Sequence, residues 1–282
     1  MNDRLLRNLI YAVTGLLILL VLAAIIYISV SDPQAEQVQE GIAYLESLEE
    51  RGSEEQLSSH TTQNTELSDV EEPTEPSETT DPSGLSAEQL ALIEQIENDE
   101  VDVWSLFHDY VILGDSRAVG FWYFDFLPEE HCLTGGGDTI RNVGMNMDGI
   151  MERQPKYIFL CYGLNDTSIG YWKTSDVYVE EMMEVIADLQ DRLPGVTVVV
   201  SSILPARDPA FERSSKWYNI PEYSAAVEAA CQEAGVIFVN NDEICEEYAH
   251  WWQPDGIHVR PEFYPYWAKN LIIGIIKGGA YE

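Results

Sequence analysis

The sequence predicts an α/β domain in residues 101–282, with three layers (α/β/α) and a flavodoxin-like parallel sheet of about five strands. Five short apolar runs, rich in Val, Ile, Leu and Phe, barely alternate with polar residues, as strands covered on both faces do. Segments with helical periodicity lie between the runs, and alternating strands and helices are typical of a parallel sheet. The predicted strands are residues 110–114, 131–134, 157–162, 196–204 and 236–240.

Three of the intervening segments have the clearest helical signals. Residues 174–193 carry an apolar stripe on one side and end at Pro194-Gly195, a pair that stops a helix. Residues 222–234 end at Gly235, which suits the left-handed conformation common after a helix. Residues 261–277 begin with a proline, which is favoured in the first turn of a helix.

A membrane anchor is predicted at the N-terminus. Residues 9–30 carry no charge and are apolar or small apart from a few Tyr, Thr and Ser, and Arg4 and Arg7 precede them. About 22 helical residues cover roughly 33 Å, which is enough to cross a bilayer. Because no basic residue follows until Arg51, the positive-inside rule places the N-terminus in the cytoplasm and the rest of the chain outside the cell membrane. A cleaved signal peptide is the alternative, although no clear cleavage site follows the run.

With the anchor assigned to residues 1–31, residues 32–100 are expected to form an acidic stalk and a disordered linker. The stretch 52–84 is rich in Ser, Thr, Glu and Pro and almost lacks large apolar side chains. Such a composition cannot bury enough apolar surface to offset the conformational entropy of an ordered chain. Near the end of this region, Ser86 and Gln89 match a capping box, so we expect a short helix there that docks on the domain.

The overall charge excludes some partners. The 282 residues include 15 Lys+Arg and 49 Asp+Glu, which gives a formal net charge of -34. Such a chain should repel nucleic acid, whose binding depends on neutralising phosphates, and should not adhere directly to an anionic membrane surface. The four cysteines lack metal-ligand spacing, and we expect no cofactor or metal. They are interpreted as small buried residues, and a disulfide between Cys231 and Cys245 remains open.

A hydroxyl group stands at the end of the first predicted strand. The run 110–114 stops at the turn Gly114-Asp115-Ser116, and a helical pattern follows from Arg117. Ligands of open α/β sheets bind at the carboxyl edge of the strands, and free amide N–H groups at a helix start stabilise a developing anion. Ser116 is therefore a candidate nucleophile.

Three later segments offer the groups that ester hydrolysis requires besides a nucleophile: a base, an orienting acid and oxyanion donors. Asp255 and His258 are spaced so that the carboxylate reaches the imidazole. Asn165 follows the third strand, and Gly137 follows the second. Each segment alone could be an ordinary turn. However, all of them follow a predicted strand or lie in the last loop, so we expect them at one edge of the sheet.

These four segments, in this order, resemble those of the GDSL/SGNH hydrolase family, over about residues 109–277. The resemblance implies an SGNH hydrolase fold with Ser116 as nucleophile, His258 as base and Asp255 as its orienting acid. It also implies an oxyanion hole formed by the serine N–H, a glycine N–H and the Asn165 side chain.

Two glycines match the family's variable glycine segment. Gly135-Gly136-Gly137-Asp138-Thr139 resembles its G-D-T form and points to Gly137. Asn142-Val143-Gly144 resembles its N-x-G form, but it falls inside an expected helix, so Gly144 is the second choice.

Arg117 stands where the family's name has leucine, and a cation beside the serine would favour anionic substrates. The alternative is a surface arginine paired with an acid. Aromatic residues around the expected cleft suit stacking on sugars, with packing in the core as the alternative. They are Tyr171, Trp172, Trp217, Tyr218, Trp251 and Trp252.

Together these features predict a membrane-anchored, extracytoplasmic serine esterase. By resemblance, its substrate is an acylated glycan or a small ester, and the leading expectation is removal of O-acetyl groups from a cell-surface glycan. The first alternative is an O-acyltransferase that works with a multi-span membrane acyltransferase on a wall polymer. The second is a non-catalytic binding domain displayed on a stalk.

Overall fold

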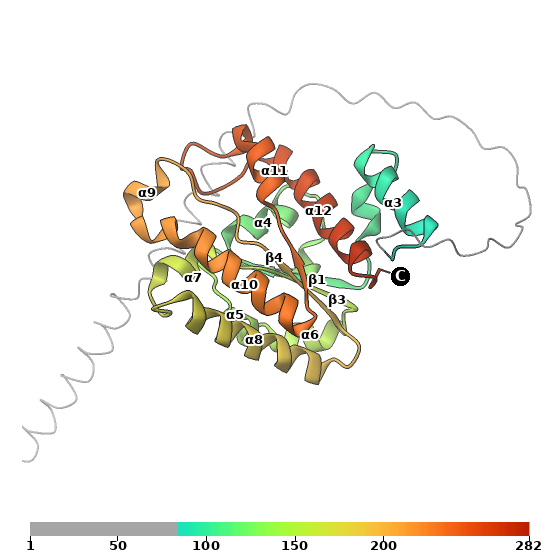
Figure 1. Ribbon diagram of the computed structural model, residues 1–282, viewed down its shortest axis with the longest axis horizontal. Coiled ribbons are helices and arrows are strands. Elements are labelled where there is room, and N and C mark those ends of the chain that lie inside the picture. Colours follow the sequence, from blue (N-terminus) through green and yellow to red (C-terminus); the bar gives the residue numbers. More distant parts are fainter. Residues whose placement is uncertain (1–83, 282) are drawn as a thin grey trace, which may run out of the picture. The chain divides into compact units, whose positions relative to one another are not determined.

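Five parallel strands form one sheet in the computed structural model, which describes residues 84–281 (Figure 1). The strand order is β2-β1-β3-β4-β5, and every pair of neighbours is parallel. The strands are β1 (Tyr110–Gly114), β2 (Cys132–Thr134), β3 (Tyr157–Cys161), β4 (Thr197–Ser201) and β5 (Ile237–Val239). The predicted fold class and number of strands are confirmed.

Helices cover both faces of this sheet. The evidence is that residues of β1 alternate between two buried clusters, one on each face. Ile112 packs with one cluster, whereas Val111 and Leu113 pack with the other. The helices of the first cluster are α3 (Ala87–Glu97), α4 (Ser116–Tyr123), α11 (Asp242–Glu247) and α12 (Tyr264–Lys277). Those of the second are α5 (Asn142–Met145), α6 (Met147–Arg153), α7 (Leu164–Ile169), α8 (Ser175–Arg192), α9 (Ala210–Arg213) and α10 (Ile220–Ala234). Burial on both sides explains why the strand sequences do not alternate.

Short 3₁₀ turns complete the described part of the chain. They are η1 (Val103–Leu106), η2 (Glu129–His131), η3 (Ser215–Asn219), η4 (Ala249–Trp251) and η5 (Pro261–Phe263). The last of these is where the sequence predicted the first turn of a helix from residue 261, and regular α-helix begins only at Tyr264. The predicted helices at 174–193 and 222–234 are confirmed as α8 and α10.

The predicted strand at 196–204 is too long, because β4 ends at Ser201. Ile203 and Leu204 are nevertheless buried, which explains the apolar run. After Ser202 donates its N–H to Val239 of β5, the chain leaves the sheet, and the Leu204 carbonyl accepts a hydrogen bond from Arg117. The apolar run therefore continues through a buried loop rather than a strand.

The capping box before α3 is confirmed. Ser86 Oγ accepts the N–H of Gln89 at 3.1 Å, and Gln89 Oε1 accepts the N–H of Ser86 at 2.9 Å. Ile93 and Ile96 are buried in the same cluster as the apolar side of α12. Helix α3 thus docks on the sheet domain, as expected.

The N-terminal predictions lie outside the described residues. These are the membrane-spanning run at 9–30 and the tether up to residue 83. Between residues 84 and 281, no helix is both long enough and apolar enough to cross a bilayer. All four cysteines are buried and free, so the pairing of Cys231 with Cys245 that the sequence left open does not form.

The register of the sheet determines where the functional turns lie. Gly114, the last residue of β1, is aligned with Thr134 of β2 on one side and with Cys161 of β3 on the other. The three turns that follow these strands therefore emerge side by side at one edge. This is the edge where ligands of open α/β sheets bind.

Candidate active site

A chain of two hydrogen bonds joins three of the predicted site residues. Ser116 Oγ lies 2.9 Å from His258 Nε2, and His258 Nδ1 lies 2.6 Å from Asp255 Oδ2. Ser116 is the first residue of α4, directly after β1, whereas Asp255 and His258 come from the loop between η4 and η5. The fold thus brings together groups that are 142 residues apart in the sequence.

The two carboxylate oxygens of Asp255 have different hydrogen-bond partners. Oδ1 accepts the backbone N–H groups of Ile257 and His258 at 2.9 and 3.0 Å, which closes the turn, while Oδ2 faces the imidazole. Burial acts to raise the pKa of Asp255, but the hydrogen bonds from His258 and from the backbone outweigh it and hold the pKa below its ordinary value. An ionised carboxylate accepts Nδ1–H, and in that tautomer Nε2 is the acceptor that faces the serine hydroxyl.

Glycine is required in this turn. Gly256 has a φ of +73°, and a Cβ there would lie 2.2 Å from the carbonyl oxygen of Arg207. This close approach allows the N–H of Arg207 to donate to the Gly256 carbonyl at 2.7 Å. The segment that leaves β4 is thereby fastened to the turn that carries Asp255 and His258.

The predicted cation beside the serine is not available to a substrate, and that interpretation is wrong. The Arg117 side chain is 3% exposed and Asp115 is 0% exposed. Arg117 Nε and Nη2 donate to the two oxygens of Asp115 at 3.2 and 3.1 Å, and Nη1 donates to the Leu204 carbonyl. The pair is also buried, so it is not the surface pair of the alternative interpretation. Asp115 further accepts the N–H of Leu164 at 3.3 Å.

The Asn165 turn also depends on a glycine. Gly163 has a φ of +133°, and a Cβ there would lie 2.3 Å from Cγ1 of Ile203. This turn makes Asn165 the second residue of α7, where its side chain donates from Nδ2 to the Asp138 carbonyl at 2.9 Å. A primary amide has two N–H donors, so one donor of Asn165 is left over.

The two candidate glycines lie in different surroundings. Gly137 is buried, has a φ of +82° and directly precedes Asp138, whose carbonyl Asn165 contacts. Gly144 is exposed and lies within α5. The structure therefore brings Gly137, rather than Gly144, next to Asn165.

Sequence analysis did not single out Asp166, which is fully buried. Its Oδ1 accepts the N–H of Ile140 at 2.9 Å, so it ties the glycine loop to α7. Its Oδ2 is buried without a hydrogen-bond partner among the described residues. Burial first, and then the nearby charge of Asp115, raise the pKa of Asp166 to about 7. The sequence signal that could have pointed to Asp166 is its position directly after Asn165, in a turn that follows a predicted strand.

Most of the predicted cleft aromatics pack in the core. Trp172, Trp217 and Trp252 are buried, and each indole N–H has a partner inside the protein: Glu181, the Leu164 carbonyl and the Pro205 carbonyl, respectively. Trp251 is half-buried. Of the six aromatics named from sequence, Tyr171 and Tyr218 are exposed.

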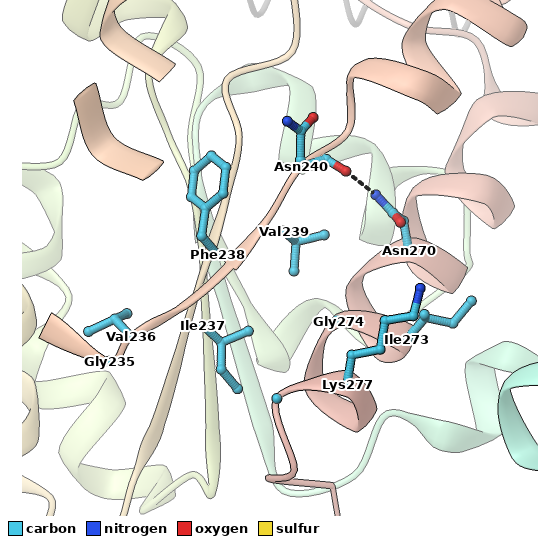
Figure 2. A pocket seen from close by; sticks show the side chains of 11 residues that line it. Gly235, Val236, Ile237, Phe238, Val239, Asn240, Asn270, Ile273, Gly274 and Lys277 are labelled. Atoms are coloured by element: carbon cyan, nitrogen blue, oxygen red, sulfur yellow. Dashed lines mark hydrogen bonds between the residues drawn. The ribbon is translucent and has the colours of Figure 1, made fainter. Parts of the chain in front are cut away.

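Away from these residues, a hollow of about 450 Å³ lies between β5 and α12 (Figure 2). Glycines and aliphatic side chains line much of it, and Asn270 donates to the Asn240 carbonyl at 2.8 Å within it. Lys277 is its only ionisable lining residue, so the hollow holds no pair of groups that could act as nucleophile and base. Within residues 84–281, no group of three or more His, Cys, Asp or Glu side chains is placed to hold a metal ion.

Comparison with known proteins gives a family match over most of the domain. The family described as GDSL-like lipase/acylhydrolase matches residues 112–264, a range that contains all the predicted site residues. No curated protein matches the chain in sequence.

Solved structures resemble the domain as well. A lipase/acylhydrolase from Enterococcus faecalis aligns with a TM-score of 0.50 and 15% identity, over 59% of this chain and 95% of its own. A GDSL-like lipase from Bacteroides thetaiotaomicron aligns with a TM-score of 0.49 and 16% identity, over 67% and 98%. An acetylxylan esterase from Geobacillus stearothermophilus aligns with a TM-score of 0.42 and 15% identity, over 59% and 93%. The likeness to the Enterococcus protein shows a shared fold.

The raised pKa of Asp166 predicts a pH dependence of stability. Because its pKa of about 7 in the folded chain exceeds the value of about 3.9 in an unfolded chain, the folded state holds a proton between pH 4 and 7 that the unfolded state releases. The free energy of unfolding should therefore fall as pH rises through this window. Asp166→Asn keeps an acceptor for Ile140 but cannot ionise, so its free energy of unfolding should fall less, by on the order of 1–4 kcal/mol.

Urea denaturation of the wild type and of Asp166→Asn at pH 4.5, 5.5, 6.5 and 7.5 measures this difference. Glu94→Gln, on the exposed side of α3, is the control and should follow the wild type. Parallel pH curves for the wild type and Asp166→Asn would contradict the prediction.

Proposed function

The chain belongs to the GDSL-like lipase/acylhydrolase family of serine hydrolases, and we propose that Ser116 is the nucleophile with which it cleaves carboxylic esters. The observation that carries the proposal is the unbroken pair of hydrogen bonds from Ser116 through His258 to Asp255, at 2.9 and 2.6 Å. This is the arrangement that activates a serine hydroxyl in an acyl-transfer enzyme.

In the proposed reaction, Ser116 Oγ attacks the ester carbonyl carbon while its proton moves to His258 Nε2. Asp255, held ionised, favours the imidazolium that forms. When the tetrahedral intermediate collapses, the C–O bond to the alcohol breaks and His258 returns the proton to the leaving oxygen. Water, activated by His258 in the same way, then releases the acyl group from Ser116.

The oxyanion of the intermediate would be met by three donors. The N–H of Ser116 is in the first turn of α4, where amides have no partner within the helix. Asn165 supplies its remaining side-chain N–H, and Gly137 supplies a backbone N–H from the loop that Asn165 contacts. The burial of Gly137 and the exposure of Gly144 support this choice of glycine.

The proposed substrate is an O-acyl group, acetyl in the first instance, on a cell-surface glycan. The predicted anchor at residues 9–30 and the tether after it support this choice, because they would keep the domain within reach of the envelope. In the alternative transfer reaction, a sugar hydroxyl replaces water in the second half, and the acyl group would come from a multi-span membrane acyltransferase. An assay with and without a glycan acceptor distinguishes the two reactions.

Replacing Ser116 by Ala should abolish ester hydrolysis while the protein remains folded, because the attacking oxygen is lost. Turnover of p-nitrophenyl acetate by the full-length chain measures the effect, and a fluorophosphonate probe should label the wild type at Ser116 alone. Ser105→Ala, which removes a hydroxyl that donates to the Asp102 carbonyl at the start of η1, is the control and should keep both properties. Wild-type turnover by Ser116→Ala would refute the assignment.

Asn165→Ala should act on the chemical step. Loss of one oxyanion donor typically lowers kcat by about 10²–10³-fold, or roughly 3–4 kcal/mol, with a much smaller change in KM. Steady-state kinetics on p-nitrophenyl acetate measure both constants, and Asn98→Ala, at the end of α3, is the matched control. If KM rises while kcat stays constant, Asn165 binds the substrate and is not an oxyanion donor.

The proposed topology is a single-pass anchor with the catalytic domain outside the cell. Protease added to intact cells should cut the predicted tether at 52–84 and release a soluble C-terminal fragment that hydrolyses p-nitrophenyl acetate. Lysed cells are the control in which the tether is accessible in either orientation. A domain that resists cleavage until lysis would show that the orientation is wrong.

A further inference from the structure

Two exposed tyrosines, Tyr171 and Tyr218, lie in the segments that follow β3 and β4. Within residues 84–281, four large hydrophobic side chains are exposed: Met145 (81%), Tyr171 (42%), Val177 (46%) and Tyr218 (63%). All four lie in segments that follow the carboxyl ends of β2, β3 and β4. Of these four, the two tyrosines carry an apolar ring with a polar hydroxyl, the kind of side chain that is enriched at binding surfaces.

The two tyrosines of this set lie on neighbouring segments. Lys216 Nζ donates to the Ser168 carbonyl at 2.7 Å, and a Cβ on Gly170 would lie 2.8 Å from the same nitrogen. Segment η3 therefore packs against the end of α7. Tyr218 follows Lys216 by two residues, and Tyr171 comes directly after Gly170, so the tyrosines flank this contact.

The contact is close to the proposed oxyanion donor. Asn165 stands near the start of α7, and the helix rise from Asn165 to residue 170 is about 8 Å. The indole N–H of Trp217 donates to the Leu164 carbonyl at 2.9 Å, which fixes η3 beside the start of the same helix. The contact that the tyrosines flank therefore lies within about 8 Å of helix rise from Asn165.

Each tyrosine ring is held by a neighbour. Tyr218 stacks on Phe211 with ring centroids 3.9 Å apart and an interplanar angle of 9°. The guanidinium carbon of Arg141 lies 4.8 Å from the centroid of Tyr171, and Glu181 in turn binds Arg141 at 2.6 and 2.9 Å. Because the rings are already ordered, a ligand that packs on them costs little additional side-chain entropy.

We propose that Tyr171 and Tyr218 form a tyrosine rim that binds sugar units next to the acylated one. This inference rests on the proposed function and adds that the domain binds the sugar units beside the acylated one. A sugar ring combines an apolar C–H face with polar hydroxyls. It therefore complements an aromatic ring that has an apolar body and a polar tip. The Lys216 ammonium beside the rim adds a donor for those hydroxyls.

The test uses the full-length chain with acetylated xylan oligosaccharides and with p-nitrophenyl acetate. Tyr171→Ala and Tyr218→Ala should each raise KM for the oligosaccharides by about 2- to 12-fold and leave kcat unchanged. Tyr171→Phe and Tyr218→Phe keep the ring and should stay within about 2-fold of the wild type. Hydrolysis of p-nitrophenyl acetate, which has no sugar, should be unaffected by all four changes.

Met145→Ala is the matched control, because it removes an exposed apolar side chain from the same edge without removing a ring. Wild-type KM values for both alanine variants would overturn the rim, as would phenylalanine variants impaired as strongly as alanine variants. A parallel loss of p-nitrophenyl acetate turnover would also overturn it, because that result means a distorted catalytic centre.

A binding measurement distinguishes failure of the tyrosine rim from failure of the proposed function. In native gels that contain deacetylated xylan, the wild type should be retarded and the double variant Tyr171→Ala/Tyr218→Ala should not. If the wild type is retarded but hydrolyses neither ester, the proposed function fails and the rim stands. If the wild type hydrolyses p-nitrophenyl acetate but is not retarded, the rim fails and the nucleophile assignment stands.

Discussion

The buried ion pair between Asp115 and Arg117 is the interaction on which the arrangement of the site depends. Asp115 accepts hydrogen bonds from Arg117 and from the N–H of Leu164, so the nucleophile turn is fixed to the start of α7. Arg117 reaches the Leu204 carbonyl at the exit from β4. That exit in turn binds the Asp255 turn through Arg207 and Gly256. One pair thus connects the turns that carry Ser116, Asn165 and His258.

Such a pair is stable only because its hydrogen-bonding groups are satisfied. Removing two charges from water costs several kcal/mol per ion. This cost is offset only when the geometry is good and further hydrogen bonds satisfy the remaining donors and acceptors of each ion. Here backbone groups of Leu164 and Leu204 provide the additional partners. The stability of the pair and the position of the catalytic turns therefore depend on the same contacts.

Two further carboxyl groups respond to the charge of Asp115. Burial first and then Asp115 raise the pKa of Asp138 to about 6 and that of Asp166 to about 7. Both belong to the connection between the glycine loop and α7, through the Asp138 carbonyl and the Oδ1 atom of Asp166. The Asp166 carboxyl group is fully buried and that of Asp138 is half-buried, and both lie near a third acid. This environment favours their neutral forms and avoids placing several uncompensated charges together.

The sequence alone determined the class of fold, the five strands, the cap of α3 and the order of the segments around Ser116, Asn165, Asp255 and His258. These features are local: apolar runs predict buried strands, and glycine beside Asn or Asp predicts the turns at 163–166 and 255–258. The tertiary structure decided the partners of Arg117, one of which is a carbonyl 87 residues away. It also decided that β4 ends at Ser201 and that the chain continues as a buried loop. It also decided the burial of Asp166 and the exposure of Tyr171 and Tyr218. Periodicity along a chain records which side of an element is apolar, whereas solvent exposure, pKa and long-range partners depend on which segments the closed fold places together.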